Sequence, residues 1–289
     1  MFDSRQPIID QLRASGWIHA VHWFDSIDST NSVARRELMK TGVSPVLFIA
    51  DQQTAGRGRS DHHWWSPNGC LMLTLTIDSA CLPDNRNDWG QLALVCGVAA
   101  ADSVDHILGS SVAQLKWPND IYLDGKKLGG ILIESVRTQS PPMDLSETTP
   151  LLQRGYRPDN YQWLIGIGVN VDVDWENAPR DLRHTANCLT QYAGTHIDAS
   201  ALLVDLLQRL ELRIIDWAQN SGQNWSDDWK RRCLLTGKLV RAQVNDRPDP
   251  MVGYCPGIDS RGRLLLESAT GLQTLVSAQI LDWHEPGAH

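Results

Sequence analysis

The sequence predicts an α+β protein in which one large domain is followed by a small β-rich domain. Three observations lead to this fold class. Apolar runs typical of strands alternate with long helical segments over residues 1–232. After the polar stretch at 220–228 the pattern changes, and residues 233–289 carry only short β-type runs separated by turn residues. The length of 289 residues fits one large domain and one small one.

Helices are predicted at three places in the large domain. The first, at 29–40, opens on polar capping residues and ends before Gly42. The second, at 88–108, is apolar over most of its length, and we expect Asp88 to be its cap. The third, at 199–219, is amphipathic, with leucines recurring at helical spacing.

Strands of the large domain are expected at 46–50, 70–77, 112–117, 128–136 and 163–171. Leucines alternate with threonines in the second of these, which is the period of a strand. In the small domain the expected strands lie at 238–244, 263–268 and 273–280, a pattern typical of a small barrel or sandwich. Residues 137–160 are rich in Pro, Ser and Thr and predict an exposed loop.

Composition argues against several classes of partner. The formal net charge of −8 predicts no general attraction to nucleic acid or to an anionic membrane. We find no apolar run of about 18 residues and no hydrophobic signal core near the first residues. We therefore expect a cytoplasmic protein with no membrane or nucleic-acid partner.

Cysteine and histidine usage predicts no metal centre. The six cysteines form no CxxC pair, so we expect reduced and buried thiols and no zinc site. His62 and His63 are adjacent but have no further partner at metal-ligand spacing. They are interpreted as a solvated pair in a loop.

A glycine- and arginine-rich segment, Gly56-Arg57-Gly58-Arg59, joins two predicted strands. Glycines let a backbone approach a ligand, and the forked guanidinium donors suit phosphate or carboxylate. Trp64, a few residues later, offers a flat surface on which a purine could pack. A solvated turn or a general anion contact would give the same local pattern.

Two further segments carry residues suited to a binding site. Lys127 stands at the start of a predicted strand, after the turn that contains Asn119 and Asp120. A lysine on such a fixed support can neutralise developing negative charge, although a lysine guarding a sheet edge is the alternative. In the segment 166–170 alternate glycines could admit a ligand beside a strand, or they could serve a close strand crossing. A P-loop motif is absent from the sequence.

Taken in order, these segments resemble the biotin–protein ligase family over about residues 17–235. The resemblance is carried by Asp28–Asn31, Gln53–Arg59, Trp64–Pro67, Lys116–Asp120, Lys127–Leu132 and Gly166–Asn170. It implies a mixed β-sheet flanked by helices, of the class II synthetase and lipoate ligase kind. It also implies a catalytic domain at 1–232 and an SH3-like β-barrel domain at 233–289.

The resemblance further implies a set of site residues. Biotin contacts are expected at Ser29, Thr30, Asn31, Gln53, Gly56, Arg57, Gly58, Arg59, Lys127, Gly129 and Gly166. Adenylate contacts are expected at Arg57, Arg59, Trp64, Asn119, Lys127, Gly168 and Asn170. Lys127, Arg59 and Asp120 would be the catalytic residues, with Asp120 the base or orienter of the acceptor amine. No metal ligand is assigned to the protein.

The implied activity has two steps. Attack of the biotin carboxylate on the α-phosphate of ATP gives biotinyl-5′-AMP and pyrophosphate, with Mg²⁺ and the cationic side chains offsetting the repulsion of two anions. Biotin then passes to a lysine of a biotin carboxyl carrier domain of a carboxylase. A loop that excludes water would protect the mixed anhydride.

Some features depart from the family pattern or leave alternatives open. Asp61 and His62 stand where the family often has a glycine and a basic residue, and no ATP contact is carried over to Ser277–Ile280. Too few residues precede position 17 for the DNA-binding domain of repressor-type members, so we expect the monofunctional type. A homodimer is one option for the oligomeric state. The alternatives are a lipoate- or octanoate-handling ligase, a non-catalytic binder of biotin or its adenylate, and a nucleic-acid module.

Overall fold

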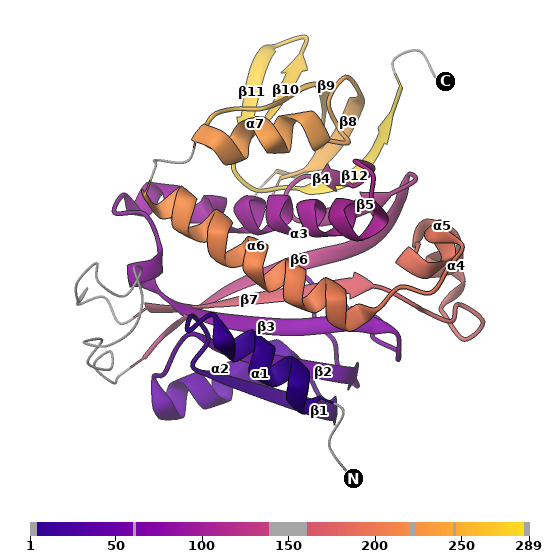
Figure 1. Ribbon diagram of the computed structural model, residues 1–289. Coiled ribbons are helices and arrows are strands. Elements are labelled where there is room, and N and C mark those ends of the chain that lie inside the picture. The colour runs from indigo at the N-terminus through magenta and orange to yellow at the C-terminus, as the bar shows by residue number, and fades with distance from the viewer. Residues whose placement is uncertain (1–4, 60–61, 139–160, 220–222, 245–246, 286–289) are drawn as a thin grey trace.

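A seven-stranded mixed sheet forms the centre of the protein, which we describe from a computed structural model (Figure 1). The structure describes residues 5–59, 62–138, 161–219, 223–244 and 247–285. The strands are β1 (Ala20–Ile27), β2 (Val46–Gln53), β3 (Cys70–Asp78), β4 (Gln114–Lys116), β5 (Asp120–Leu123), β6 (Lys126–Arg137) and β7 (Tyr161–Asn170). Their order is β1-β2-β3-β7-β6-β5-β4, and β1 runs parallel to β2 while every other pair is antiparallel.

Helices cover both faces of this sheet. The helices are α1 (Gln6–Ala14), α2 (Thr30–Thr41), α3 (Leu92–Leu108), α4 (Arg180–Thr185), α5 (Leu189–Ala193), α6 (Ala199–Gln219) and α7 (Gln223–Arg232), with the 3₁₀ turns η1 (Ser79–Cys81) and η2 (Arg86–Gln91). Helix α2 packs on one face against β2, β3 and β7, whereas α3 covers the opposite face and α6 packs on α3. The fold class predicted from the sequence is confirmed.

Strand β3 shows how the sequence pattern divides the two faces. Leu71, Leu73, Leu75 and Ile77 join the main apolar core with α3. Thr74 alternates with them, so it lies on the other face, toward α2, and it is fully buried. Because both faces of the strand are covered, polar groups on the α2 side must find partners inside the protein, and this places a polar network where a site could form.

The C-terminal part forms a second, five-stranded antiparallel sheet. Its strands are β8 (Leu239–Gln243), β9 (Met251–Ile258), β10 (Leu264–Ser268), β11 (Gly271–Leu275) and β12 (Gln279–His284), in the order β11-β10-β9-β8-β12. The main apolar core extends from the large sheet into this one. Trp117 Nε1 donates to the Gly262 carbonyl at 2.9 Å, and Trp225 packs where a Cβ on Gly262 would lie, 3.0 Å away. The predicted boundary at 232/233 falls at the end of α7.

Several local predictions differ from the structure. Helix α3 starts at Leu92, after the 3₁₀ turn η2, so Asp88 is not its cap; Asn85 instead accepts from the Asn87 N–H at the start of η2. Strand β5 was not predicted because it has only four residues and begins at the polar Asp120. The run at 273–280 is divided between β11 and β12. The predicted loop at 137–160 begins within β6 at Arg137, Thr138 is buried, and the rest of the loop lies outside the described residues.

The segment Arg86–Leu108 is long and apolar enough, by composition, to cross a membrane. In the fold, 72% of its most apolar window is buried inside the protein. Its apolar residues belong to the main core between the sheet and α6. The hydrophobicity of this helix is therefore explained by its place in the core.

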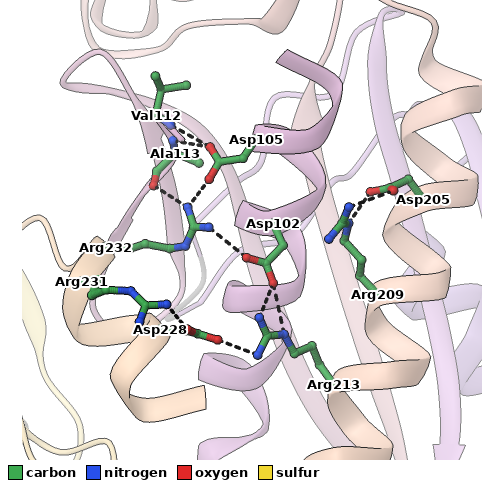
Figure 2. Close-up of polar contacts among 10 residues, drawn as sticks. All are labelled: Asp102, Asp105, Val112, Ala113, Asp205, Arg209, Arg213, Asp228, Arg231 and Arg232. Carbon is green, nitrogen blue, oxygen red and sulfur yellow. Dashed lines mark hydrogen bonds and ion pairs between the residues drawn. The ribbon is translucent and has the colours of Figure 1, made fainter. Parts of the chain in front are cut away.

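Two aspartates of α3 hold α7 in place (Figure 2). Asp105 accepts from the backbone N–H groups of residues 112 and 113, each at 2.8 Å, and pairs with Arg232 of α7. Asp102 pairs with Arg232 at 2.9 Å and with Arg213 of α6 at 2.6 Å. Because α7 leads directly into the small sheet, this network fixes where that sheet sits on the large one.

Replacing Asp105 with Asn should lower the free energy of unfolding by about 2 kcal/mol, because the charge pair with Arg232 is lost at a buried position. Urea unfolding measures the change. Asp227→Asn is the matched control. It removes an exposed ion pair between Asp227 and Lys230, both on α7. It should alter the free energy of unfolding very little. Equal losses in the two variants would contradict a special role for the contact between α3 and α7.

Candidate active site

A cavity of about 460 Å³ lies where several distant segments meet. Its walls come from the start of α2, the loop that follows β2, strands β6 and β7, the turn at 117–119 and the segment 277–280 of the small sheet. The large sheet forms the floor, and the α2 face of β3 contributes Met72. The cavity therefore lies between the two sheets and is not formed by the large sheet alone.

One end of the cavity is polar but carries no net charge. The Gln53 Oε1 atom accepts from the Thr30 backbone N–H at 2.8 Å and from the Thr30 hydroxyl at 3.1 Å. The Thr74 hydroxyl lies 2.9 Å from the Thr30 hydroxyl. Gln53 Nε2 donates to the Ser66 hydroxyl at 3.0 Å, which ties the loop after β2 to the same network. Hydroxyl and amide groups held in this way suit a neutral ligand group that both donates and accepts hydrogen bonds.

A carboxylate beside this end organises three cationic or amide side chains. Glu134 of β6 accepts from Asn31 Nδ2 at 2.8 Å, from both terminal nitrogens of Arg57 at 3.0 and 3.1 Å, and from Arg35 at 3.0 Å. Burial raises the pKa of Glu134, but the hydrogen bond from Asn31 and the charges of Arg57 and Arg35 outweigh burial and bring the pKa below its ordinary value. The carboxylate is therefore ionised at neutral pH.

Gly166 makes room for Asn31 rather than for open space. A Cβ at position 166 would lie 2.2 Å from Asn31 Oδ1. Asn31 Oδ1 accepts from the Thr74 hydroxyl at 2.6 Å, so both ends of the Asn31 amide have partners in the protein. The glycine at 166 thus allows the start of α2 to approach the sheet closely.

The centre of the cavity is cationic. Lys127 Nζ lies 2.6 Å from Asp120 Oδ1, and Lys116 Nζ lies 3.7 Å from Asp120 Oδ2. Arg59 donates to Asn119 Oδ1 at 3.3 Å and to the Ser277 hydroxyl at 3.4 Å. Burial lowers the pKa of Arg59, although the charge of Asp120 opposes the shift, and a guanidinium stays protonated in proteins. Three cations against one carboxylate make this a place for an anion.

Lys116 is the most enclosed of these cations. Its side chain is 12% exposed, and its Nζ lies 4.8 Å from the ring centroid of Trp283 in the small sheet. Burial lowers the pKa of Lys116, and Lys127 lowers it further, whereas Asp120 raises it. No site role was predicted for Lys116 or Trp283, because their contact joins strands more than a hundred residues apart in the sequence.

The other end of the cavity is aromatic. The Trp64 ring lies 3.0 Å from where a Cβ on Gly168 would be, and Lys127 Nζ lies 5.5 Å from the Trp64 ring centroid. Trp65 and Trp175 lie with their ring centroids 6.0 Å apart. The buried Nε1 atoms of Trp64 and Trp175 have no hydrogen-bond acceptor in the described part of the chain. This end offers flat aromatic surfaces to a planar ligand.

Comparisons with known proteins agree with this geometry. The sequence pattern of the Biotin/lipoate A/B protein ligase family matches residues 23–143. A biotin–[acetyl-CoA-carboxylase] ligase of Mycobacterium tuberculosis is 30% identical over 274 residues, which is 93% of this chain and 91% of that protein. The chain belongs to the biotin–protein ligase family. The bifunctional ligase/repressor BirA of Bacillus subtilis is 29% identical over 89% of this chain and 72% of its own length.

Solved structures of biotin–protein ligases share the fold. The Aquifex aeolicus biotin protein ligase in complex with biotin and ATP superposes with a TM-score of 0.72, covering 93% of this chain and 100% of that one at 23% identity. The Leishmania major biotin protein ligase in complex with biotinyl-5-AMP gives a TM-score of 0.58, covering 89% of this chain and 98% of that one at 24% identity. The recognised family and the fold expected from the sequence are both confirmed.

Most residues predicted from the ligase motifs line the one cavity. They are Ser29, Thr30, Asn31, Gln53, Arg57, Gly58, Arg59, Trp64, Asn119, Asp120, Lys127, Gly166, Gly168 and Asn170. Gly56 and Gly129 lie outside its lining. A Cβ on Gly56 would lie 2.4 Å from the Trp64 carbonyl oxygen, and one on Gly129 would lie 2.6 Å from the Gly168 carbonyl oxygen, so each glycine allows close backbone packing.

The ligase motifs did not point to every lining residue. Trp175 and Ser277–Ile280 line the cavity, and no contact had been assigned to either from the sequence. The only sequence signal for Trp175 is the unusual tryptophan content of the chain. His62 and His63 are exposed as predicted, and Asp61 lies outside the described residues.

The six cysteines are all buried and none is in a disulfide. Burial raises the pKa of Cys70 to about 12, so its thiol stays protonated. These thiols act as small apolar side chains.

Proposed function

We propose that this chain activates biotin with ATP to biotinyl-5′-AMP and transfers biotin to a lysine of a carrier domain. One observation carries the proposal: Lys127 and Arg59, from segments far apart in the sequence, line one cavity that is polar at one end and aromatic at the other. Biotin matches the neutral polar end with its ureido group, and the adenine of ATP matches the aromatic end. The two anionic reacting groups then meet at the cationic centre.

In the first step the protein brings two anions together and stabilises the charge that develops. The biotin carboxylate attacks the α-phosphorus of ATP, a new C–O–P linkage forms, and pyrophosphate leaves with the electron pair of the broken bond. Lys127 is proposed to contact both the carboxylate and the phosphate, because its ammonium is held at the centre by Asp120, 2.6 Å away. Arg59 is proposed to cover the other side of the phosphate.

The side chains that the structure describes at the cavity offer no set of ligands for a resident metal ion. In the described ranges no three His, Cys, Asp or Glu residues cluster as a metal site. Asp120, the carboxylate at the cavity centre, is already paired with Lys127 and lies near Lys116. We propose that Mg²⁺ enters as part of the ATP substrate, bound to its phosphates, as magnesium usually does in nucleotide sites.

In the second step a neutral lysine amine attacks the carbonyl carbon of the mixed anhydride and a C–N amide bond forms. The C–O bond to the phosphate breaks, AMP leaves with its electron pair, and the amine proton passes to solvent. Asp120 is proposed to orient the incoming lysine, because its carboxylate lies at the cavity centre, 2.6 Å from the Lys127 ammonium and 3.7 Å from that of Lys116. The names of relatives such as the Mycobacterium tuberculosis ligase favour a biotin carboxyl carrier domain as acceptor. We propose a cytoplasmic location, where such carriers are made.

The direct test is incubation with ATP, Mg²⁺, biotin and a carboxyl carrier domain, followed by intact mass. A gain of one biotinyl group on the carrier is the expected result. A protein that binds biotin and ATP but never modifies the carrier would be a non-catalytic binder, and the proposal would be wrong.

Biotin should bind more tightly than lipoate. The dithiolane ring of lipoate has no N–H or C=O group, so it cannot form hydrogen bonds with the polar network of Thr30 and Gln53. In thermal-shift measurements with ATP present, biotin should raise the melting temperature by several degrees when its concentration is about 100 times its dissociation constant. Lipoate at the same concentration should give a much smaller shift. A larger shift with lipoate would favour the lipoate-handling relative.

A further inference from the structure

Glu134 lies in the middle of β6, between Ile133 and Ser135, and none of the proposed catalytic steps uses it. Its carboxylate is 15% exposed, and it receives four hydrogen bonds from three side chains. An ionised carboxylate at this level of burial requires such compensation. The side chains that donate to Glu134 therefore indicate its role.

Two of those partners belong to the proposed biotin site and come from different walls. Asn31 is on the first turn of α2, while Arg57 is on the loop that also carries Arg59. Both terminal nitrogens of Arg57 are used on Glu134, at 3.1 and 3.0 Å. A forked contact of this kind fixes orientation as well as distance. Glu134 thus connects a fixed wall of the cavity to the loop opposite.

The contact also extends into the neutral polar end. Asn31 Oδ1 accepts from Thr74, and the missing side chain of Gly166 leaves the space that Asn31 fills. A displacement of Glu134 would therefore disturb Asn31 and Arg57 together. It would leave the Lys127 and Asp120 pair, which has separate contacts, in place.

We infer that Glu134 is a positioning residue for biotin: it fixes the position of the loop that carries Arg57 relative to Asn31 on the opposite wall of the cavity. Arg57 then affects biotin binding by setting the position of its loop, because both terminal nitrogens of its guanidinium donate to Glu134. The inference rests on the proposed function, because it concerns the biotin end of that site.

The test compares Glu134→Gln with Arg35→Gln. Arg35 pairs with the same carboxylate at 3.0 Å but does not line the cavity, so its variant removes a charge partner without freeing the loop. In the adenylate-forming step, Glu134→Gln should raise KM for biotin about tenfold while kcat changes less than about twofold. Arg35→Gln should stay within about twofold of the parent in both constants.

A second measurement does not depend on biotin. Trypsin cleaves after arginine, and Arg57 should be cut about tenfold faster in Glu134→Gln, because its side chain and loop lose their anchor. Arg35→Gln should be cut at the parent rate. Unchanged cleavage and unchanged KM in Glu134→Gln would overturn the inference, as would equal effects in the two variants.

The single variant Arg57→Gln covers the case in which Glu134→Gln fails to fold, and a double-mutant cycle applies where both fold. Arg57→Gln breaks the same contact from the exposed side and leaves Glu134 with Asn31 and Arg35, so it should fold and should also raise KM for biotin. In a folded double variant the second substitution should add less than about twofold. A parent-like KM in Arg57→Gln, or full additivity, overturns the inference; a parent enzyme that forms no adenylate overturns the proposed function itself.

Discussion

Lys127→Ala should reduce the rate of biotinyl-adenylate formation by about 100- to 1,000-fold, because the cation at the meeting point of two anions is lost. The ammonium is fixed 2.6 Å from Asp120 and faces the cavity, so no nearby solvated side chain can replace it in the same position. Pyrophosphate release on mixing with ATP and biotin measures the rate. The melting temperature should stay close to that of the parent, because the side chain is partly exposed.

Lys126→Ala is the matched control for this prediction. Lys126 is adjacent on β6 and carries the same charge, but it does not line the cavity. Its variant should form the adenylate at the parent rate. Normal adenylation by Lys127→Ala, or an equal loss in Lys126→Ala, would show that position 127 does not supply the decisive charge.

The sequence was most informative where local physics decides the structure. Helix α2 begins after Ser29, although the Ser29 side chain makes no capping hydrogen bond, and it is capped at its other end by Gly42, which has a φ of 65°. This second end follows from the conformational freedom of glycine. The alternation in β3 likewise predicted which residues face α3. Neither result required knowledge of a distant residue.

Contacts between residues far apart in the sequence could not be predicted in the same way. Trp283 reaches Lys116 only because α7 and the small sheet are docked by the network around Asp102 and Asp105. The role of Glu134 likewise depends on Arg57, 77 residues earlier in the chain. A lone carboxylate within an apolar strand was the available signal, since such a group must be compensated once buried.

Glycine positions show a related limit. The motif containing Gly129 and Gly130 predicted a ligand contact at the first glycine, but the second lines the cavity, with its missing Cβ 3.5 Å from Asp120 Oδ1. A one-residue difference along a strand moves a side chain to the opposite face. The pairing of β5 with β6 is irregular between Ile121 and Tyr122, at the point of β6 between Lys127 and Gly129. Lys127 and Gly130 therefore both line the cavity although they are three residues apart.

Arg59→Gly should leave adenylate formation largely intact but release the adenylate about 100-fold faster than the parent, because the loop would lose its polar contacts with the opposite walls. Arg59 joins the loop to Asn119 at 3.3 Å and to Ser277 of the small sheet at 3.4 Å. Lys127 keeps its own partner in this variant, so the first reaction still has its central cation. Gel filtration after one turnover measures the adenylate that stays bound.

Ser277→Ala separates the two contacts of Arg59, since it removes only the one with the small sheet. It should release the adenylate a few-fold faster at most, because Asn119 still accepts from the guanidinium. Arg59→Gly is expected to lie far above Ser277→Ala, because it removes both contacts and also the charge proposed to cover the phosphate. If Arg59→Gly retains its adenylate as tightly as the parent does, closure of the loop through Arg59 is wrong, and water must be excluded by the aromatic side chains instead.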